Sequence, residues 1–150
     1  MTIFALKKYQ VATLGVLQAY LEAARIVGAK PAFDDMDKAG VRASPAYRPL
    51  EGLETVPYVC LRLPTGGGKT LLSAHTVKIA ADAYLEREFP IVLWLVPTNT
   101  IRAQTLETLK KPTNPNYETL RAAFCGRSRG HGPPAGGPWR FASEGNLSFW

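Results

Sequence analysis

The feature that most constrains this chain is a glycine-rich turn, Pro64-Thr-Gly-Gly-Gly-Lys-Thr70, between two patterned segments. An apolar, β-prone run at 58–63 precedes the turn, and an amphipathic helical pattern begins at Lys69. Glycine permits backbone angles that other residues avoid, so successive N–H groups can converge on one concavity. The helix that follows adds the positive end of its dipole. The turn therefore predicts a binding site for phosphate groups.

The side chains of the turn suggest which phosphates would bind. In phosphate-binding loops of this kind the lysine, here Lys69, reaches the β- and γ-phosphates, and the following hydroxyl, here Thr70, ligates Mg²⁺. The strict pattern requires glycine where this chain has Leu63, and the alternative is a glycine-rich turn with an incidental Lys-Thr pair. The flanking segments favour the phosphate loop, with Lys69 and Thr70 as catalytic residues. We predict that the nucleotide contacts Thr65, Gly66, Gly67, Gly68, Lys69 and Thr70.

The order of the patterned segments predicts an α/β protein. The apolar runs at 58–63 and 91–96 are typical of strands buried in a parallel sheet, and the helix between them would complete a βαβ unit. Residues 29–55 are interrupted by proline and glycine, so we expect a long insertion there, with room for one short turn at 34–38. Helices are predicted from Lys8 to about Gly28, from Lys69 to about Phe89, from Thr98 or Asn99 to about Lys110 and from Asn116 to about Phe124.

The composition restricts the chemical class of binding partner and the cellular compartment that we expect. Lys and Arg number 18 against 12 Asp and Glu, a net charge of +6 that favours a polyanionic partner without proving one. No apolar run approaches the length of a membrane span, and no signal peptide is evident, so we expect a cytoplasmic protein with no membrane partner. Cys60 lies within an apolar run, so we predict a buried thiol in a reducing compartment.

Three segments in order resemble motifs of superfamily 2 helicases. Pro64–Thr70 resembles motif I, especially as it occurs in the type III restriction endonuclease Res subunit and the related DEAD/DEAH-box helicases. Leu6-Lys-Lys-Tyr-Gln10 is similar to the Leu-x-x-Tyr-Gln segment of these proteins, and Leu95–Gln104 is similar to their motif Ia. The resemblance covers roughly residues 6–120, without the insertion.

The resemblance implies a fold, cofactors and partners. It implies that residues 1–125 form part of a RecA-like ATP-binding domain, with a parallel sheet and flanking helices, that uses ATP and Mg²⁺. It also implies that Gln10 reads the adenine edge, although a glutamine in a first helical turn can equally be a solvated polar residue. DNA is the expected partner, bound weakly through its backbone, and a methylase or specificity subunit is a further one. The residues implied to touch nucleic acid are Pro97, Thr98, Asn99 and Arg102. The first three can instead serve only to begin a helix, and Arg102 can equally be a surface residue.

The chain departs from this family in one large respect. Its 150 residues contain no Asp-Glu-x-His/Asp box, the acidic motif that holds Mg²⁺ in these ATPases, and residues 126–150 form a Gly/Pro-rich, atypical tail. We therefore expect the N-terminal part of an ATP-dependent DNA helicase or restriction subunit, truncated or altered in frame. The alternative is a non-catalytic nucleotide-binding module or an inert remnant. A P-loop kinase or GTPase is weaker, because it leaves Tyr9-Gln10 and 97–99 unexplained.

Overall fold

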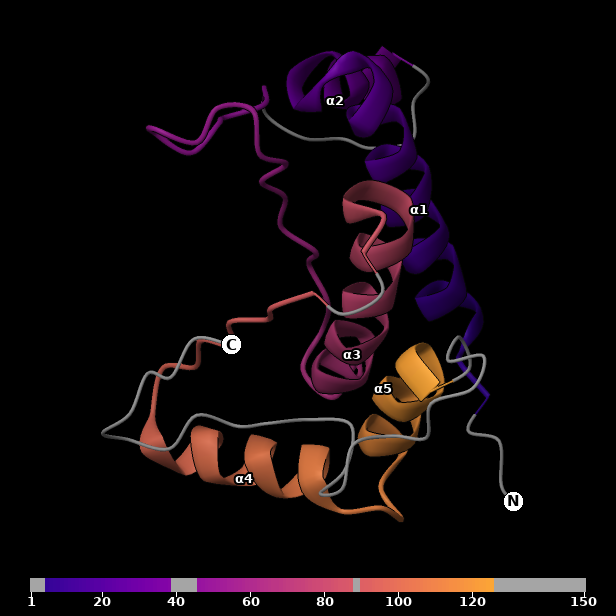
Figure 1. The fold of residues 1–150 in the computed structure, drawn as a ribbon, viewed down its shortest axis with the longest axis vertical. Helices are drawn as coiled ribbons and strands as arrows, with labels where there is room; N and C mark the ends of the chain where they lie inside the picture. The colour runs from indigo at the N-terminus through magenta and orange to yellow at the C-terminus, as the bar shows by residue number, and fades with distance from the viewer. Residues whose placement is uncertain (1–4, 39–45, 88–89, 126–150) are drawn as a thin grey trace.

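The computed structural model describes residues 5–38, 46–87 and 90–125, which form helices joined by extended segments (Figure 1). Helices α1 and α3 lie side by side, α2 packs across one end of α1, and α5 packs against α3 and α4. None of the described helices is long and apolar enough to cross a bilayer. The elements are α1 (Lys8–Val27), α2 (Ala29–Lys38), α3 (Lys69–Ala80), the π-helical turn η1 (Ala81–Leu85), α4 (Asn99–Lys110) and α5 (Pro115–Cys125).

Helix α1 is confirmed and forms because its apolar residues recur at three- and four-residue spacing. Leu14, Leu17 and Leu21 are buried on the predicted face, but Val11 and Val27, at its two ends, are about half exposed. Gly28 ends the helix with φ 94°, and its N–H donates to the Ala24 carbonyl at 3.0 Å. The core that α1 builds with α2 and η1 comprises Leu17, Tyr20, Leu21, Ala24, Ala32 and Ala83.

The prediction of an unpatterned insertion at 29–55 is wrong for its first ten residues, which form α2. Ala29 and Ala32 are buried against α1, and the Phe33 ring meets Tyr20 edge-on with ring centroids 6.0 Å apart. Pro31 suggested a break in the helical pattern. It lies in the first turn of α2, where a proline's missing N–H has no intrahelical acceptor to lose.

The predicted parallel sheet, and with it the α/β RecA-like architecture, is wrong for the described part of the chain, which contains helices and no strand. Residues 58–63 and 91–96 are extended, but no backbone hydrogen bond joins either segment to another among the described residues. Instead the two segments flank an apolar groove of about 410 Å³ whose other walls come mainly from α1, α3 and η1. Strand formation needs a neighbouring backbone at about 4.8 Å with which to exchange hydrogen bonds, and within the described residues neither segment has one.

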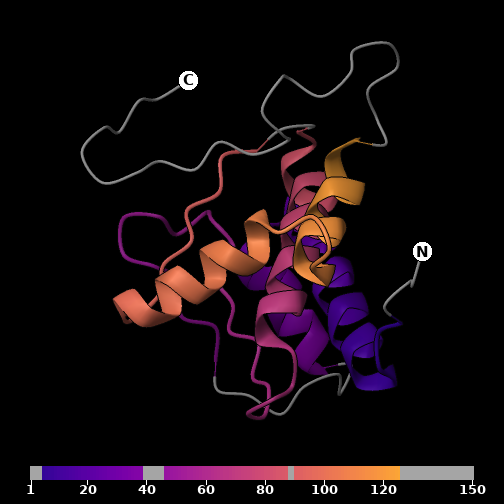
Figure 2. The same cartoon turned by 90° about the horizontal axis from the view of Figure 1, so that it is seen from below.

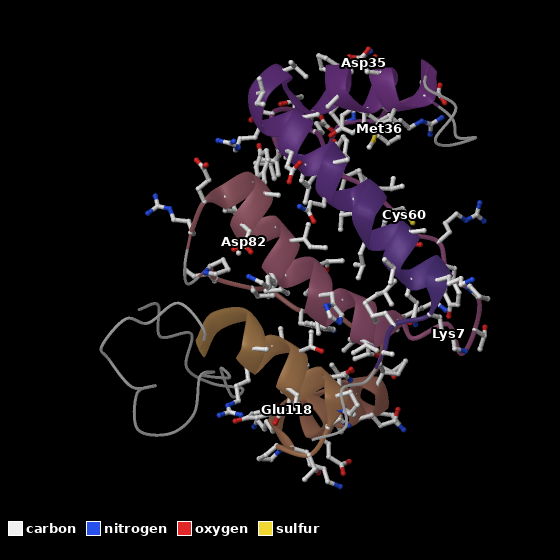
Figure 3. All side chains as sticks on the ribbon, turned by 90° about the vertical axis from the view of Figure 1, so that its right-hand side faces the viewer. Lys7, Asp35, Met36, Cys60, Asp82 and Glu118 are labelled. Carbon is white, nitrogen blue, oxygen red and sulfur yellow. The ribbon has the colours of Figure 1, made fainter. Side chains whose placement is uncertain are left out.

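The apolar run at 91–96 is consequently exposed rather than buried. Figure 2 draws it as an extended segment that leads to the start of α4. Ile91 is 83% exposed, Leu93 80% and Leu95 81%, while the alternate residues Trp94 and Val96 are partly covered. Helices cover this segment on one side only, whereas the prediction of a central strand assumed cover on both. Cys60, labelled in Figure 3, is a free, exposed cysteine for the same reason, so the predicted buried thiol is also wrong.

The remaining helices agree with expectation. Helix α4 begins at Asn99, and the Thr98 hydroxyl caps it by accepting from the Ile101 N–H at 3.3 Å. Helix α5 begins at Pro115, a favoured residue for a first helical position. The long helix predicted from Lys69 is α-helical to Ala80 and then widens into η1. The predicted atypical tail, residues 126–150, lies outside the described residues.

Candidate nucleotide-binding site

The glycine-rich turn is a tight loop in which glycine is required at three positions, for two different reasons. Gly66 and Gly68 have φ of 75° and 80°, in the left-handed region that residues with a Cβ atom avoid. Gly67 donates its N–H to the Pro64 carbonyl at 3.0 Å, and a Cβ atom on Gly67 would lie 2.9 Å from that same oxygen. A side chain at position 67 would therefore break the turn that closes the loop.

The loop leads directly into α3, whose first turn supplies backbone donors. The N–H groups of Lys69, Thr70 and Leu71 have no intrahelical acceptor, and none elsewhere in the described backbone accepts from them. These donors point along the helix axis at its positive end, where an anion is stabilised. The donor set fits a phosphate group of a nucleotide.

The Lys69 side chain is exposed and folds back onto the loop. Its Nζ donates to the Pro64 carbonyl oxygen at 2.9 Å, the same oxygen that accepts from the Gly67 N–H. Lys69 lies beside the donors of α3 and needs only to release this carbonyl to reach a bound phosphate. Thr70 is half-buried in the same turn, and its hydroxyl is the group that would ligate Mg²⁺.

The start of α1 meets the loop through two adjacent side chains. Gln10 is only 5% exposed, and its Nε2 donates to the Gly67 carbonyl at 3.0 Å. The Tyr9 hydroxyl donates to the same carbonyl at 3.1 Å. Residues 57 positions apart in the sequence are thus in contact, and a solvated role for Gln10 is excluded. Reasoning from the sequence missed the role of Tyr9, although its place beside Gln10 could have indicated it.

Basic residues surround this end of the molecule. Lys7, labelled in Figure 3 at the N-terminal end of α1, and Lys8 are exposed next to the residues that contact the loop. Arg62 is exposed two residues before the loop, and Lys69 is exposed within it. Among the described residues no three His, Cys, Asp or Glu side chains gather into a metal site. The local charge suits an anion.

The predicted nucleic-acid residues lie at a separate place. Pro97 and Thr98 precede α4, and Asn99 and Arg102 are exposed in its first turn. The start of α4 and the start of α3 lie apart in both views of the ribbon (Figures 1 and 2). The structure therefore brings Gln10 to the loop but leaves these four residues as a second, exposed group.

A comparison with known protein families agrees with this arrangement. The sequence profile of the type III restriction enzyme, Res subunit, matches residues 4–131. This chain belongs to the Res-subunit family. The match includes Gln10, the loop and the start of α4, so the resemblance inferred from the three motifs is confirmed. No curated protein and no solved structure matches this Res-family chain.

Proposed function

We propose that this Res-family chain binds ATP with Mg²⁺ at the loop of residues 64–70, as part of an ATP-dependent enzyme that acts on DNA. The observation that carries the proposal is the open set of backbone donors at the start of α3, next to the Lys69 ammonium. An anion held by several N–H groups and one ammonium gains charge-assisted hydrogen bonds, which are about twice as strong as neutral ones. A phosphate chain is the ligand that uses all of these groups at once.

In this proposal each residue of the loop has one task. The glycines hold the backbone curled so that Thr65 and the N–H groups of the loop and of the first turn of α3 surround the phosphates. Lys69 leaves the Pro64 carbonyl and pairs with the β- and γ-phosphates, and the Thr70 hydroxyl holds Mg²⁺. A Mg²⁺ ion held by Thr70 would supply positive charge to offset the negative charge of the phosphates.

The second exposed group, Pro97, Thr98, Asn99 and Arg102, is proposed to contact the DNA backbone. The backbone N–H groups at the start of a helix and an arginine in its first turn can both bind a phosphate group. Such contacts do not distinguish one base sequence from another. We expect this binding to be weak, to weaken steeply as salt rises, and to show no sequence preference. A methylase or specificity subunit is the proposed protein partner in the complete enzyme.

Lys69→Ala tests the nucleotide site. Loss of the ammonium should weaken MgATP binding, measured by titration calorimetry, by tenfold or more. Lys78→Ala is the matched control, because Lys78 lies on the same helix and pairs with Asp82 at 2.6 Å, away from the loop. Equal affinity of Lys69→Ala and the wild type contradicts the phosphate-loop assignment.

Phosphate release distinguishes an enzyme from a nucleotide-binding module. The 150 residues contain no Asp-Glu box to help hold Mg²⁺ and orient water, so we expect turnover far below the ~1 s⁻¹ lower end of ordinary enzymes. DNA should not raise it. DNA-stimulated turnover that is lost in Lys69→Ala would contradict this expectation and would favour a complete ATPase.

A further inference from the structure

A second loop, at residues 46–58, projects from the helices beside α2 in both views of the ribbon (Figures 1 and 2). Two consecutive turns shape it, because the Leu53 N–H donates to the Leu50 carbonyl and the Val56 N–H donates to the Leu53 carbonyl, both at 2.9 Å. Residues that close such a turn have Cα atoms within about 7 Å of each other. Leu50, Leu53 and Val56 are therefore neighbours on this loop.

The base of the 46–58 loop is fixed by a buried tyrosine. The Tyr47 ring is only 6% exposed and packs against Phe33 of α2, with ring centroids 5.0 Å apart. The Tyr47 hydroxyl donates to the Val56 carbonyl at 3.3 Å and accepts from the Tyr58 N–H at 3.0 Å. The two ends of the loop are thus held together on α2, and the loop has a defined shape.

The large apolar side chains of the loop take no part in this anchoring and are open to solvent. Their exposed fractions lie between 44% and 58%, for Leu50, Leu53, Val56 and Tyr58. Single exposed apolar residues are ordinary on a protein surface, whereas a contiguous group marks an interaction site. A group carried by a loop that is already fixed loses little conformational entropy when a partner covers it.

The charge of the loop indicates the kind of partner. Glu51 and Glu54 are exposed between the apolar residues, against one exposed basic residue, Arg48. Backbone hydrogen bonds from the N–H groups of Glu54 itself and of Gly52 lower the pKa of the Glu54 carboxyl, so it is ionised at neutral pH. Such carboxylates repel DNA and anionic lipid, and a two-fold dimer through the loop would set them against each other.

We propose that the 46–58 loop is a docking site for a partner protein whose contacting surface is apolar and bordered by lysine or arginine. The exposed leucines and valine of the loop would meet the apolar part, and its two glutamates would pair with the basic border. The inference goes beyond the proposed nucleotide binding and does not depend on it. The loop lies beside α2, which follows the end of α1, whereas the glycine-rich loop contacts the start of α1.

Amide chemical shifts of the full chain, titrated with an amphipathic helical peptide of leucine and lysine, test the inference. The changes should concentrate at residues 46–58 and be absent there with the matching leucine–glutamate peptide. Leu53→Ser should weaken binding of the leucine–lysine peptide about tenfold, and Glu54→Gln about threefold. Leu93→Ser, which changes an exposed leucine outside the loop, is the control and should leave the affinity unchanged.

The melting temperature of Leu53→Ser should stay close to that of the wild type because Leu53 is half exposed, and Glu54→Gln decides the question if Leu53→Ser does not fold. Peptide-induced shifts that fall outside the loop, or an equal loss of affinity in Leu93→Ser, overturn the inference. Shifts at 46–58 produced by duplex DNA, by phosphatidylserine vesicles or by raising the concentration of the chain alone also overturn it. These three outcomes would assign the loop to nucleic acid, to a membrane or to a second copy, respectively.

A variant of the anchor tests whether the fixed shape of the loop matters. Tyr47→Phe keeps the buried ring and removes both hydrogen bonds of the hydroxyl, so amide exchange at Tyr58 should accelerate and peptide binding should weaken about threefold. Tyr20→Phe is the control, since its hydroxyl donates to the Ala29 carbonyl at 3.3 Å, outside the loop. Equal peptide affinity of Tyr47→Phe and the wild type would contradict a role for the anchor in docking.

Discussion

The glycine-rich turn at 64–68 and the extended segment at 91–96 both lie outside the helices, yet their backbone polar groups and apolar side chains are accommodated differently. In the loop, the Pro64 carbonyl accepts from the Gly67 N–H and from Lys69, and the Gly67 carbonyl accepts from α1. In the extended segment no backbone hydrogen bond to another part of the described chain is found, and Ile91 and Leu93 are at least 80% exposed.

The difference shows what each kind of segment needs for its structure. A tight turn satisfies its own groups within a few residues, so its conformation depends mainly on which residues tolerate the required angles. A strand satisfies none of its groups internally and depends on another backbone beside it. The conformation of the loop can therefore be tested by substitutions within the loop itself. The conformation of the extended segment depends on which other part of the fold lies beside it.

Gly67→Val should have the largest effect on MgATP affinity. It breaks the hydrogen-bonded turn that the loop has and the extended segment lacks. The Cβ atom would lie 2.9 Å from the Pro64 carbonyl oxygen, which is backbone and cannot move aside easily. We expect MgATP affinity, measured by calorimetry, to fall by more than tenfold. Gly15→Val is the control, since no atom lies within 4 Å of the added Cβ there. A Gly67→Val protein with wild-type affinity would show that the turn is not needed.

Leucine-to-alanine changes at positions 72 and 93 compare the core beneath the loop with the extended segment. Leu72 is 1% exposed on α3, so Leu72→Ala should cost about 2–4 kcal/mol of the free energy of unfolding. Leu93 is 80% exposed, so Leu93→Ala should change it by less than about 0.5 kcal/mol. Urea denaturation measures both. Equal losses would mean that Leu93 is buried in solution and that the contrast between the two regions is wrong.

Thr98→Ala tests the junction between the extended segment and α4. Removing the hydroxyl that accepts from the Ile101 N–H should destabilise the start of α4 by about 0.5–1 kcal/mol. Amide exchange at residues 101 and 102 should accelerate. Thr100→Ala, a change in the same helical turn outside the cap position, serves as the control. Equal exchange in both variants would contradict a capping role for Thr98.

Substitution of His75, which lies on α3 where it faces α1, should have the smallest effect, a change in how stability depends on pH. Burial lowers the pKa of His75 below its usual 6.5. The unfolded chain therefore binds a proton more readily than the folded one, and stability should decrease as pH falls through about 6.5. His75→Gln should reduce the decrease in melting temperature between pH 7.5 and 5.5, measured by circular dichroism. An unchanged slope would mean that other groups account for it.

The helices were predictable because their signals are local. The apolar spacing of Leu14, Leu17 and Leu21 and the cap at Thr98 require nothing beyond a few neighbouring residues. The failure to predict α2 has a local origin too. Pro31 was interpreted as a helix breaker, although it lies in the first turn of the helix, where proline is tolerated. The tight turn at the three glycines was equally predictable, because glycine adopts the positive φ found at positions 66 and 68 far more readily than other residues.

The tertiary structure decided two things that no local pattern contains. It placed Tyr9 and Gln10 on the Gly67 carbonyl, since only the packing of α1 beside α3 brings such distant residues together. It also left 58–63 and 91–96 on either side of a groove, although their composition is that of strands. A sequence determines which segments can turn, coil or extend, but partners for backbone groups and cover for apolar faces come from other parts of the fold.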